Sequence, residues 1–209
     1  MKKKLLVVGV TGGIGSGKSE VCRTFQRLGV PRGSIVSADD IAKTLMETRE
    51  TLKKELRAAF GTAVYHPNGT LDRQYLAELV FSDPLFTRRI NAIVHPHVLA
   101  ELRQRILRDA ESSKSPFLLV EAALLFQSGA DAMMDYVIVV DADEETRMAR
   151  ALRRGDMSRS DFLRRANAQG ATKEKVGRAD FVVVNNGSLR DLADKVGFLY
   201  KLIVSIGRG

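Results

Sequence analysis

LLVVGVTGGIGSGKS, residues Leu5–Ser19, is the stretch that decides the fold of this chain. Its apolar first part, Leu5–Val10, predicts a buried strand. The part that follows, Gly12–Ser19, fits the phosphate-loop pattern G-x-x-x-x-G-K-[ST], and a helix is expected from Ser19 to Leu28, stopping at Gly29. A strand, a glycine-rich loop and a helix in this order predict a site for a nucleoside triphosphate and a magnesium ion.

The residue types of this loop suit a ligand with several negative charges. Glycine has no Cβ atom, so the main chain can curl and direct successive N–H groups toward phosphate oxygens. We expect Lys18 to reach the β- and γ-phosphates and the Ser19 hydroxyl to ligate magnesium. The expected nucleotide-binding residues are Gly13, Ile14, Gly15, Ser16, Gly17, Lys18, Ser19 and Glu20.

Two other interpretations of the glycines fit less well. Counted from Gly13, a dinucleotide-binding pattern G-x-G-x-x-G would need a third glycine where Lys18 stands. Counted from Gly15, it would need one where Glu20 stands. A glycine-rich turn with a chance Lys-Ser pair does not explain the strand and helix on either side.

The composition is that of one medium-sized α/β domain: 209 residues, 44% of them hydrophobic, with no apolar stretch long enough to span a bilayer. The lysines and apolar run at the N-terminus resemble a signal peptide, but cleavage there would destroy the predicted first strand. The single cysteine, Cys22, excludes an internal disulfide and is expected to be a small buried hydrophobe. We expect a cytoplasmic protein that is a monomer or a weak homo-oligomer and has no membrane partner.

The formal charge of +8 has two interpretations. Nucleic-acid binding is one of them. Against it, the chain has no compact basic run, and only 6% of its residues are aromatic. The arginines gather between Arg147 and Arg165, which a site for a polyanionic small molecule explains equally well. We therefore expect a small-molecule substrate and no nucleic-acid partner.

Apolar runs alternate with helical patterns along the chain, which is typical of βαβ units around a parallel sheet. The sequence therefore predicts an α/β fold of the P-loop kinase type, with a five-stranded parallel sheet flanked by helices. After the first strand, the expected strands are Ile35–Ser37, Phe117–Glu121, Tyr136–Asp141 and Phe181–Asn185, and the closing helix is Leu189–Ile206.

A long segment without sheet pattern separates the second and third strands. Leu45–Phe60 is amphipathic, Gly61–Thr70 predicts a loop or small hairpin, and helices are expected after Leu71 and after Asp83-Pro84. This block is too large for a simple crossover and predicts a helical insertion that binds the second substrate. The expected division is one domain, 1–209, with a core of about 1–43, 116–153 and 177–209, an insertion of about 44–115 and a lid of about 154–176.

Carboxylates follow two of the predicted strands. Asp39 and Asp40 come directly after the second strand, where an acid can accept a proton from a hydroxyl or hold magnesium, or can cap the next helix. Glu121 ends the third strand and is either a magnesium ligand or a strand-end charge at the surface. Asp39 is thus a candidate for either role, and Ser19 and Glu121 are the candidate metal ligands.

Arginines follow the fourth strand. Arg150 and Arg154 share a helical face, and a turn at Gly155–Ser158 begins a new helix. This pattern is typical of a lid that folds arginines over a transferring phosphate, and a solvated basic helix face is the alternative.

Two further motifs have weaker signals. His95-Pro96-His97 predicts a structural turn or helix start at Pro96, with contact between His95 and a substrate phosphate as the alternative. Asn185-Asn186-Gly187 predicts a turn after the last strand, at a place where Asn185 can contact the nucleotide. The N-K-x-D pattern of GTP-binding switches is absent.

As an ordered set, these motifs resemble the dephospho-CoA kinase family, almost from end to end. The matching residues are Thr11–Ser19, Ala38–Ala42, Phe60-Gly61, Gly69–Arg73, Val80-Phe81, His95-Pro96, Leu124–Phe126, Arg150, Arg154, Gln169 and Ala179–Gly187. The resemblance implies transfer of the γ-phosphate of ATP to the ribose 3′-hydroxyl of dephospho-CoA, with Mg²⁺. It implies catalytic roles for Asp39, Lys18, Arg150 and Arg154, and substrate binding by Thr11, Asp39, His95 and Arg150.

The chain departs from the family pattern at a few positions. The usual D-A-D after the second strand is Ser37-Ala38-Asp39, so only the second acid is kept. The stretch D-x-P-L-L-F-E appears here as Glu121–Gln127, with Ala123 in place of the proline and a final glutamine. Glu20 stands where a threonine usually follows the loop serine. A kinase of another small acceptor, such as a nucleoside monophosphate, and a nucleotide-regulated nucleic-acid-binding protein are the alternatives.

Overall fold

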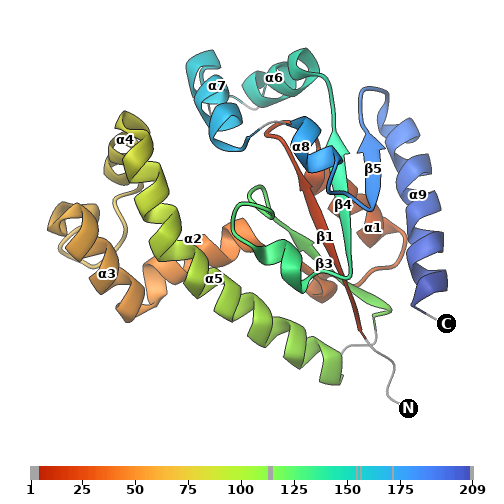
Figure 1. Cartoon of the computed structure of the whole chain (residues 1–209), viewed down its shortest axis with the longest axis horizontal. Coiled ribbons are helices and arrows are strands. Elements are labelled where there is room, and N and C mark those ends of the chain that lie inside the picture. Colours follow the sequence, from red (N-terminus) through yellow and green to blue (C-terminus); the bar gives the residue numbers. More distant parts are fainter. Residues whose placement is uncertain (1–4, 113–114, 154, 156, 171, 208–209) are drawn as a thin grey trace. The chain divides into compact units, whose positions relative to one another are not determined.

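The computed structural model describes residues 5–112, 115–153, 155, 157–170 and 172–207, and its centre is a parallel five-stranded sheet (Figure 1). The strands lie in the order β2-β3-β1-β4-β5. Their bounds are β1 (Leu6–Gly12), β2 (Ile35–Ser37), β3 (Phe117–Glu121), β4 (Tyr136–Asp141) and β5 (Phe181–Val184). The predicted α/β fold with five parallel strands and flanking helices is confirmed.

The central strand differs from its prediction at its carboxyl end. β1 was expected to stop at Val10, but it continues because Thr11 and Gly12 pair with Val139 and Val140 of β4. On the other side, Val10 pairs with Glu121, the last residue of β3. The sheet therefore carries the chain directly into the phosphate loop and brings an acidic strand end beside it.

Helices pack around the sheet within the unit that contains it. They are α1 (Lys18–Arg27), α6 (Glu144–Arg153), α7 (Arg159–Ala168), α8 (Thr172–Val176), α9 (Leu189–Ile206) and the short 3₁₀ helices η1 (Arg32–Ser34) and η3 (Ala130–Met133). In Figure 1, α6, α7 and α8 lie beyond the ends to which the arrows of β1 and β4 point. Three elements of the predicted site therefore gather at the carboxyl edge of the sheet, where ligands of open α/β sheets bind.

The core under the phosphate loop is aromatic. Phe25 of α1 is fully buried, and its ring lies 5.8 Å from Phe117 of β3 and 6.5 Å from Tyr200 of α9, between ring centroids. The helix that follows the loop is thus held against both the sheet and α9. The expected burial of Cys22 on this helix is confirmed, since its side chain is only 4% exposed.

Residues 38–104 form a second compact unit, separate from the one built by residues up to 37 and from 105 onward. Its helices are α2 (Ala38–Thr48), α3 (Glu50–Phe60), η2 (Thr62–Val64), α4 (Arg73–Ser82) and the larger part of α5 (Pro84–Ser112). Tyr65 and Leu71 form an antiparallel bridge, so of the two alternatives expected there, a loop or a small hairpin, the structure has the hairpin. The bounds and the substrate-binding role of the insertion, about 44–115, stay predictions.

The expectation of a turn or helix start at Pro96 is wrong. Pro96 lies inside α5, although a proline in a helix interior removes one main-chain hydrogen bond. The helix continues through it because Val94, Val98 and Leu102 lie on one face and are all buried. Tertiary packing thus outweighs the local signal. Among the described residues, we find no helix of the length and apolarity that crossing a membrane would need.

Truncation of the aromatic core gives a direct test of this packing. Phe25→Ala should lower the free energy of unfolding by about 3–5 kcal/mol, because it leaves a cavity between α1, β3 and α9. Urea denaturation measures this. Leu28→Ala, at a side chain that is 37% exposed just after the same helix, should cost less than about 1 kcal/mol. Equal losses for the two variants would contradict the proposed role of the aromatic cluster.

Candidate active site

The phosphate loop can be built only with glycine at several positions. Gly15 and Gly17 have positive φ angles of 77° and 102°. A Cβ atom on Gly15 would lie 2.1 Å from the main-chain oxygen of Arg147, and one on Gly17 would lie 2.3 Å from Nδ2 of Asn185. Backbone conformation and available space therefore both exclude a side chain, as a loop that wraps phosphates requires.

The loop is held in place by residues from distant parts of the chain. Asn185 donates from Nδ2 to the main-chain oxygen of Ser16 at 2.8 Å. Arg150 donates in turn to the main-chain oxygen of Asn185, also at 2.8 Å. Gln169 accepts a hydrogen bond from the main-chain N–H of Ile14 at 2.7 Å. Three segments that follow the sheet strands thus set the shape of the loop.

Lys18 and Ser19, at the start of α1, contact the loop and the end of β3. Nζ of Lys18 donates to the main-chain oxygens of Gly12 at 3.1 Å and Gly13 at 3.2 Å, so its ammonium group lies against the loop. Oγ of Ser19 donates to Oε1 of Glu121 at 2.7 Å. The structure therefore brings together the two residues that we expected to bind a metal.

The pair Ser19 and Glu121 fits a magnesium ion by its chemistry. A hydroxyl and a carboxylate are the hard oxygen ligands that magnesium takes, and one or two protein ligands are usual when phosphates and water supply the rest. The described part of the chain holds no cluster of three or more His, Cys, Asp or Glu residues that would form a self-sufficient metal site. This arrangement suits a metal that arrives with a nucleotide.

Cys22 lies next to this pair but has no chemical role in it. Burial raises the pKa of the Cys22 thiol, and the neighbouring Glu121 carboxylate raises it further. The thiol is therefore protonated near neutral pH, and a protonated buried thiol is a poor nucleophile.

Glu20, the acid that departs from the family pattern, is neutralised on its own helix. Its carboxylate contacts Nε of Arg23 at 2.9 Å and a terminal guanidinium nitrogen of Arg27 at 2.7 Å. The side chain therefore pairs with cations along α1. The predicted contact between Glu20 and the nucleotide stays a prediction.

The predicted lid contains two short helices. Ser158 and Asp161 form a capping box at the start of α7, and their hydrogen bonds lower the pKa of Asp161 to about 2. α8 follows, and Gln169 between the two helices bonds to the loop at Ile14. Arg154, the second predicted lid arginine, lies outside the described residues. The catalytic roles of Arg150 and Arg154 stay predictions.

Two predicted residues belong to the second unit and are described within it. Asp39 is the second residue of α2 and is exposed, one residue after Ala38, which directly follows β2. Its neighbour Asp40 pairs with Lys43 at 3.0 Å. His95 is half-buried in α5, and burial lowers its pKa.

Sequence reasoning assigned no role to Arg147, Gln169 or Lys175. Arg147 is buried, and its main chain defines the space around Gly15. Gln169 matched the family motif without an assigned function. Lys175 has no sequence signal at all, yet it is only 3% exposed, and burial together with nearby Lys18 and Arg147 lowers its pKa to about 8.

The comparison with known families agrees with this geometry. The family model described as dephospho-CoA kinase matches residues 6–191. The chain belongs to the dephospho-CoA kinase family. Members of this family are kinases, so ATP is the co-substrate and dephospho-CoA the small-molecule acceptor.

Related dephospho-CoA kinases align with nearly the whole chain. The one from Salinibacter ruber is 40% identical over 196 residues, covering 94% of this chain and 96% of its own. The one from Syntrophotalea carbinolica is 36% identical over 200 residues, covering 96% and 93%. The crystal structure of a Thermus thermophilus protein superposes with a TM-score of 0.77 at 34% identity, covering 96% of this chain and 98% of that one.

The steric limit at Gly15 leads to a testable outcome. Gly15→Ala should weaken binding of ATP with Mg²⁺ by at least about tenfold, because the added methyl group displaces the loop from Arg147. Isothermal titration calorimetry measures the affinity. Gly33→Ala is the matched control, since a Cβ there meets no heavy atom within 4 Å, and it should bind ATP like the wild type. Unchanged ATP binding by Gly15→Ala would refute the steric argument.

Proposed function

We propose that the protein transfers the γ-phosphate of ATP to the ribose 3′-hydroxyl of dephospho-CoA and so completes coenzyme A. The observation that carries this proposal is the match to the dephospho-CoA kinase family over residues 6–191. The phosphate loop, the adjacent hydroxyl–carboxylate pair and the helices at the carboxyl edge of the sheet support it.

The nucleotide side of the reaction rests on the loop. N–H groups of the glycine-rich turn and the start of α1 meet the phosphates, and Lys18 neutralises charge between the β- and γ-phosphates. Ser19 and Glu121 would hold Mg²⁺, which when bound offsets the charge on the phosphate oxygens. Thr11 is fully buried at the end of β1, and we assign it to phosphate binding as well.

The acceptor side rests on Asp39. We assign it the role of general base, which accepts the proton of the ribose hydroxyl as that oxygen attacks phosphorus. Arg150, with Arg154, would stabilise the charge that develops on the equatorial oxygens of the transferred group. His95 is the proposed contact for a phosphate of the acceptor. We also expect the enzyme to be cytoplasmic and a monomer or weak homo-oligomer.

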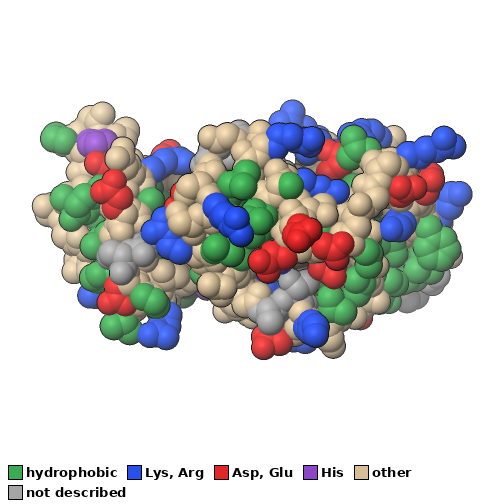
Figure 2. All heavy atoms as spheres, turned by 90° about the horizontal axis from the view of Figure 1, so that it is seen from above, with side chains coloured by type: hydrophobic (Ala, Val, Ile, Leu, Met, Phe, Trp, Pro, Cys, Tyr) green, Lys and Arg blue, Asp and Glu red, His purple; other side chains and the backbone are tan. Residues whose placement is uncertain are grey.

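The face of the molecule in Figure 2 does not favour the nucleic-acid alternative. On the face shown in Figure 2, basic and acidic side chains are interspersed rather than gathered into one continuous basic band. Nucleic-acid-binding surfaces usually show such a band or patch. The excess of positive charge is better explained by two phosphorylated substrates in one enzyme.

An acceptor panel tests the proposed substrate. ADP release should be coupled to phosphorylation of dephospho-CoA and should stay at background with AMP or dTMP. A coupled spectrophotometric assay measures this. A response to AMP or dTMP instead of dephospho-CoA would replace the proposal with a nucleoside monophosphate kinase. Salt-sensitive DNA or RNA binding without kinase activity would favour the nucleic-acid alternative.

A pair of neighbouring acids tests the proposed base. Asp39→Asn should lower kcat by about 10²–10⁴-fold and largely spare ATP binding, because the amide cannot accept the proton. Asp40→Asn, at the next residue, should keep turnover, since the Asp40 side chain is 71% exposed and pairs with Lys43. Steady-state kinetics with dephospho-CoA give both values. Unchanged turnover of Asp39→Asn would remove Asp39 from this role.

A further inference from the structure

Lys175 of α8 is a buried cation without a hydrogen-bond partner. Its side chain is 3% exposed, and Nζ bonds to no group among the described residues. An ammonium group in this condition loses its hydration without gaining a compensating bond, which is costly. Such a group is expected where a ligand supplies the missing acceptor.

The other buried side-chain atoms without a partner in the described part of the chain belong to β1 and the loop that follows it, and α8 packs on β4, the strand next to β1. The buried hydroxyl oxygens of Thr11 and Ser16 also have no hydrogen-bond partner, and both belong to the end of β1 and the phosphate loop. The buried side-chain atoms without partners therefore come from two sources, the loop and α8. A single ligand seated on the loop would satisfy both.

The charges around Lys175 identify the class of that ligand. Lys18 and Arg147 are the charged groups that act on it, and both are positive. Glu174 and Arg178 line the same pocket, but neither forms a hydrogen bond with Nζ of Lys175. Nζ of Lys175 has positive neighbours and donates to no carboxylate among the described residues, which points to a polyanion, and the loop motif points to a triphosphate.

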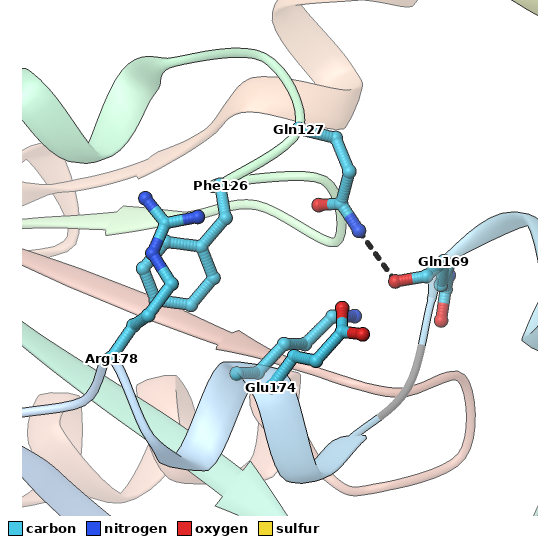
Figure 3. A pocket seen from close by; sticks show the side chains of 6 residues that line it. Phe126, Gln127, Gln169, Glu174 and Arg178 are labelled. Carbon is cyan, nitrogen blue, oxygen red and sulfur yellow. Dashed lines mark hydrogen bonds between the residues drawn. The ribbon is translucent and has the colours of Figure 1, made fainter.

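α8 is fixed at both ends, so the position of Lys175 is defined. Before the helix, Gln169 accepts from Gln127 through its main-chain oxygen and from Ile14 through its side chain. After the helix, Arg178 lies 4.2 Å above the ring of Phe126. Figure 3 shows the bond between Gln127 and Gln169 and the stacking of Arg178 on Phe126 around a pocket of about 140 Å³ that Lys175 also lines. These contacts and the packing of α8 on β4 define the position of the lysine.

We propose that Lys175 is a further phosphate-binding residue of the ATP site, which donates to the β,γ-phosphate region from the lid side while Lys18 donates from the loop side. The proposal rests on the proposed function for the identity of the triphosphate. In this arrangement α8 brings a positive charge to the transferring group without depending on the lid arginines. It also makes phosphate binding and the packing of α8 mutually dependent.

The test compares K175M with the matched control K173M, which changes an exposed lysine of the same short helix. Calorimetry and thermal melting are run with the nonhydrolysable analogue AMP-PNP and Mg²⁺, and with AMP. K175M should melt at a higher temperature than the wild type without ligand, because the unpartnered charge is gone. It should bind AMP-PNP at least about tenfold more weakly and leave AMP binding unchanged. K173M should match the wild type throughout.

A pH series separates ligand contact from a structural role. The pKa of Lys175 near 8 means that the free protein loses this charge between about pH 7 and about pH 9, so affinity for AMP-PNP should fall over that range. In K175R the charge persists, so the fall should be absent. The same lowered pKa makes the unfolded chain bind more protons between about pH 8 and about pH 10.5, so stability without ligand should rise there in the wild type relative to K175M.

The outcomes separate this proposal from the proposed function. If K175M binds AMP-PNP within about twofold of the wild type, or if wild type and K175R show the same pH dependence, the assignment of Lys175 is wrong, whatever the acceptor is. If AMP-PNP binding depends on Lys175 but dephospho-CoA is not phosphorylated, the assignment stands and the proposed substrate fails.

Discussion

The approach of the Arg147 main chain to Gly15 is the constraint on which the rest of the site depends. No side chain fits between them, so the phosphate loop and α6 touch backbone to backbone. Because the two main chains are in direct contact, a shift of one of them also shifts the other. Arg150 of α6 bonds to Asn185, which bonds to the loop at Ser16. The loop, the last turn of α6 and the end of β5 therefore behave as one assembly.

The charges around the phosphate loop favour the binding of an anionic ligand. Acidic side chains close to the loop already have partners: Glu121 accepts from Ser19, and Glu20 pairs with two arginines of its own helix. The family departure at Glu20 is tolerated for this reason, since a neutralised carboxylate near a helix N-terminus does not repel a phosphate. The ammonium group of Lys175, by contrast, is buried and has no hydrogen-bond partner among the described residues.

Much of the fold could be predicted from the sequence, because strands of a parallel sheet are buried on both faces and appear as continuous apolar runs. Ile35–Ser37, Phe117–Glu121 and Tyr136–Asp141 have the predicted bounds. The residues of the phosphate loop could be predicted because binding a triphosphate requires particular residue types at fixed positions in a short segment. Pro96 was misjudged because its helix is held by burial that no local pattern displays. Arg147 and Lys175 were missed because their surroundings exist only in the folded chain, where α6 meets the loop and α8 packs on β4.

The bond between Asn185 and Ser16 joins residues that are 169 positions apart in the chain. A protein is synthesised from its N-terminus, so the phosphate loop emerges from the ribosome long before the side-chain amide of Asn185 that bonds to it. β5, which completes the sheet edge, comes just before this amide, and α9, which packs on α1, follows it. Contacts of such long range form late in folding. A nascent chain of this protein can therefore form this contact of the phosphate loop only after residue 185 has been synthesised.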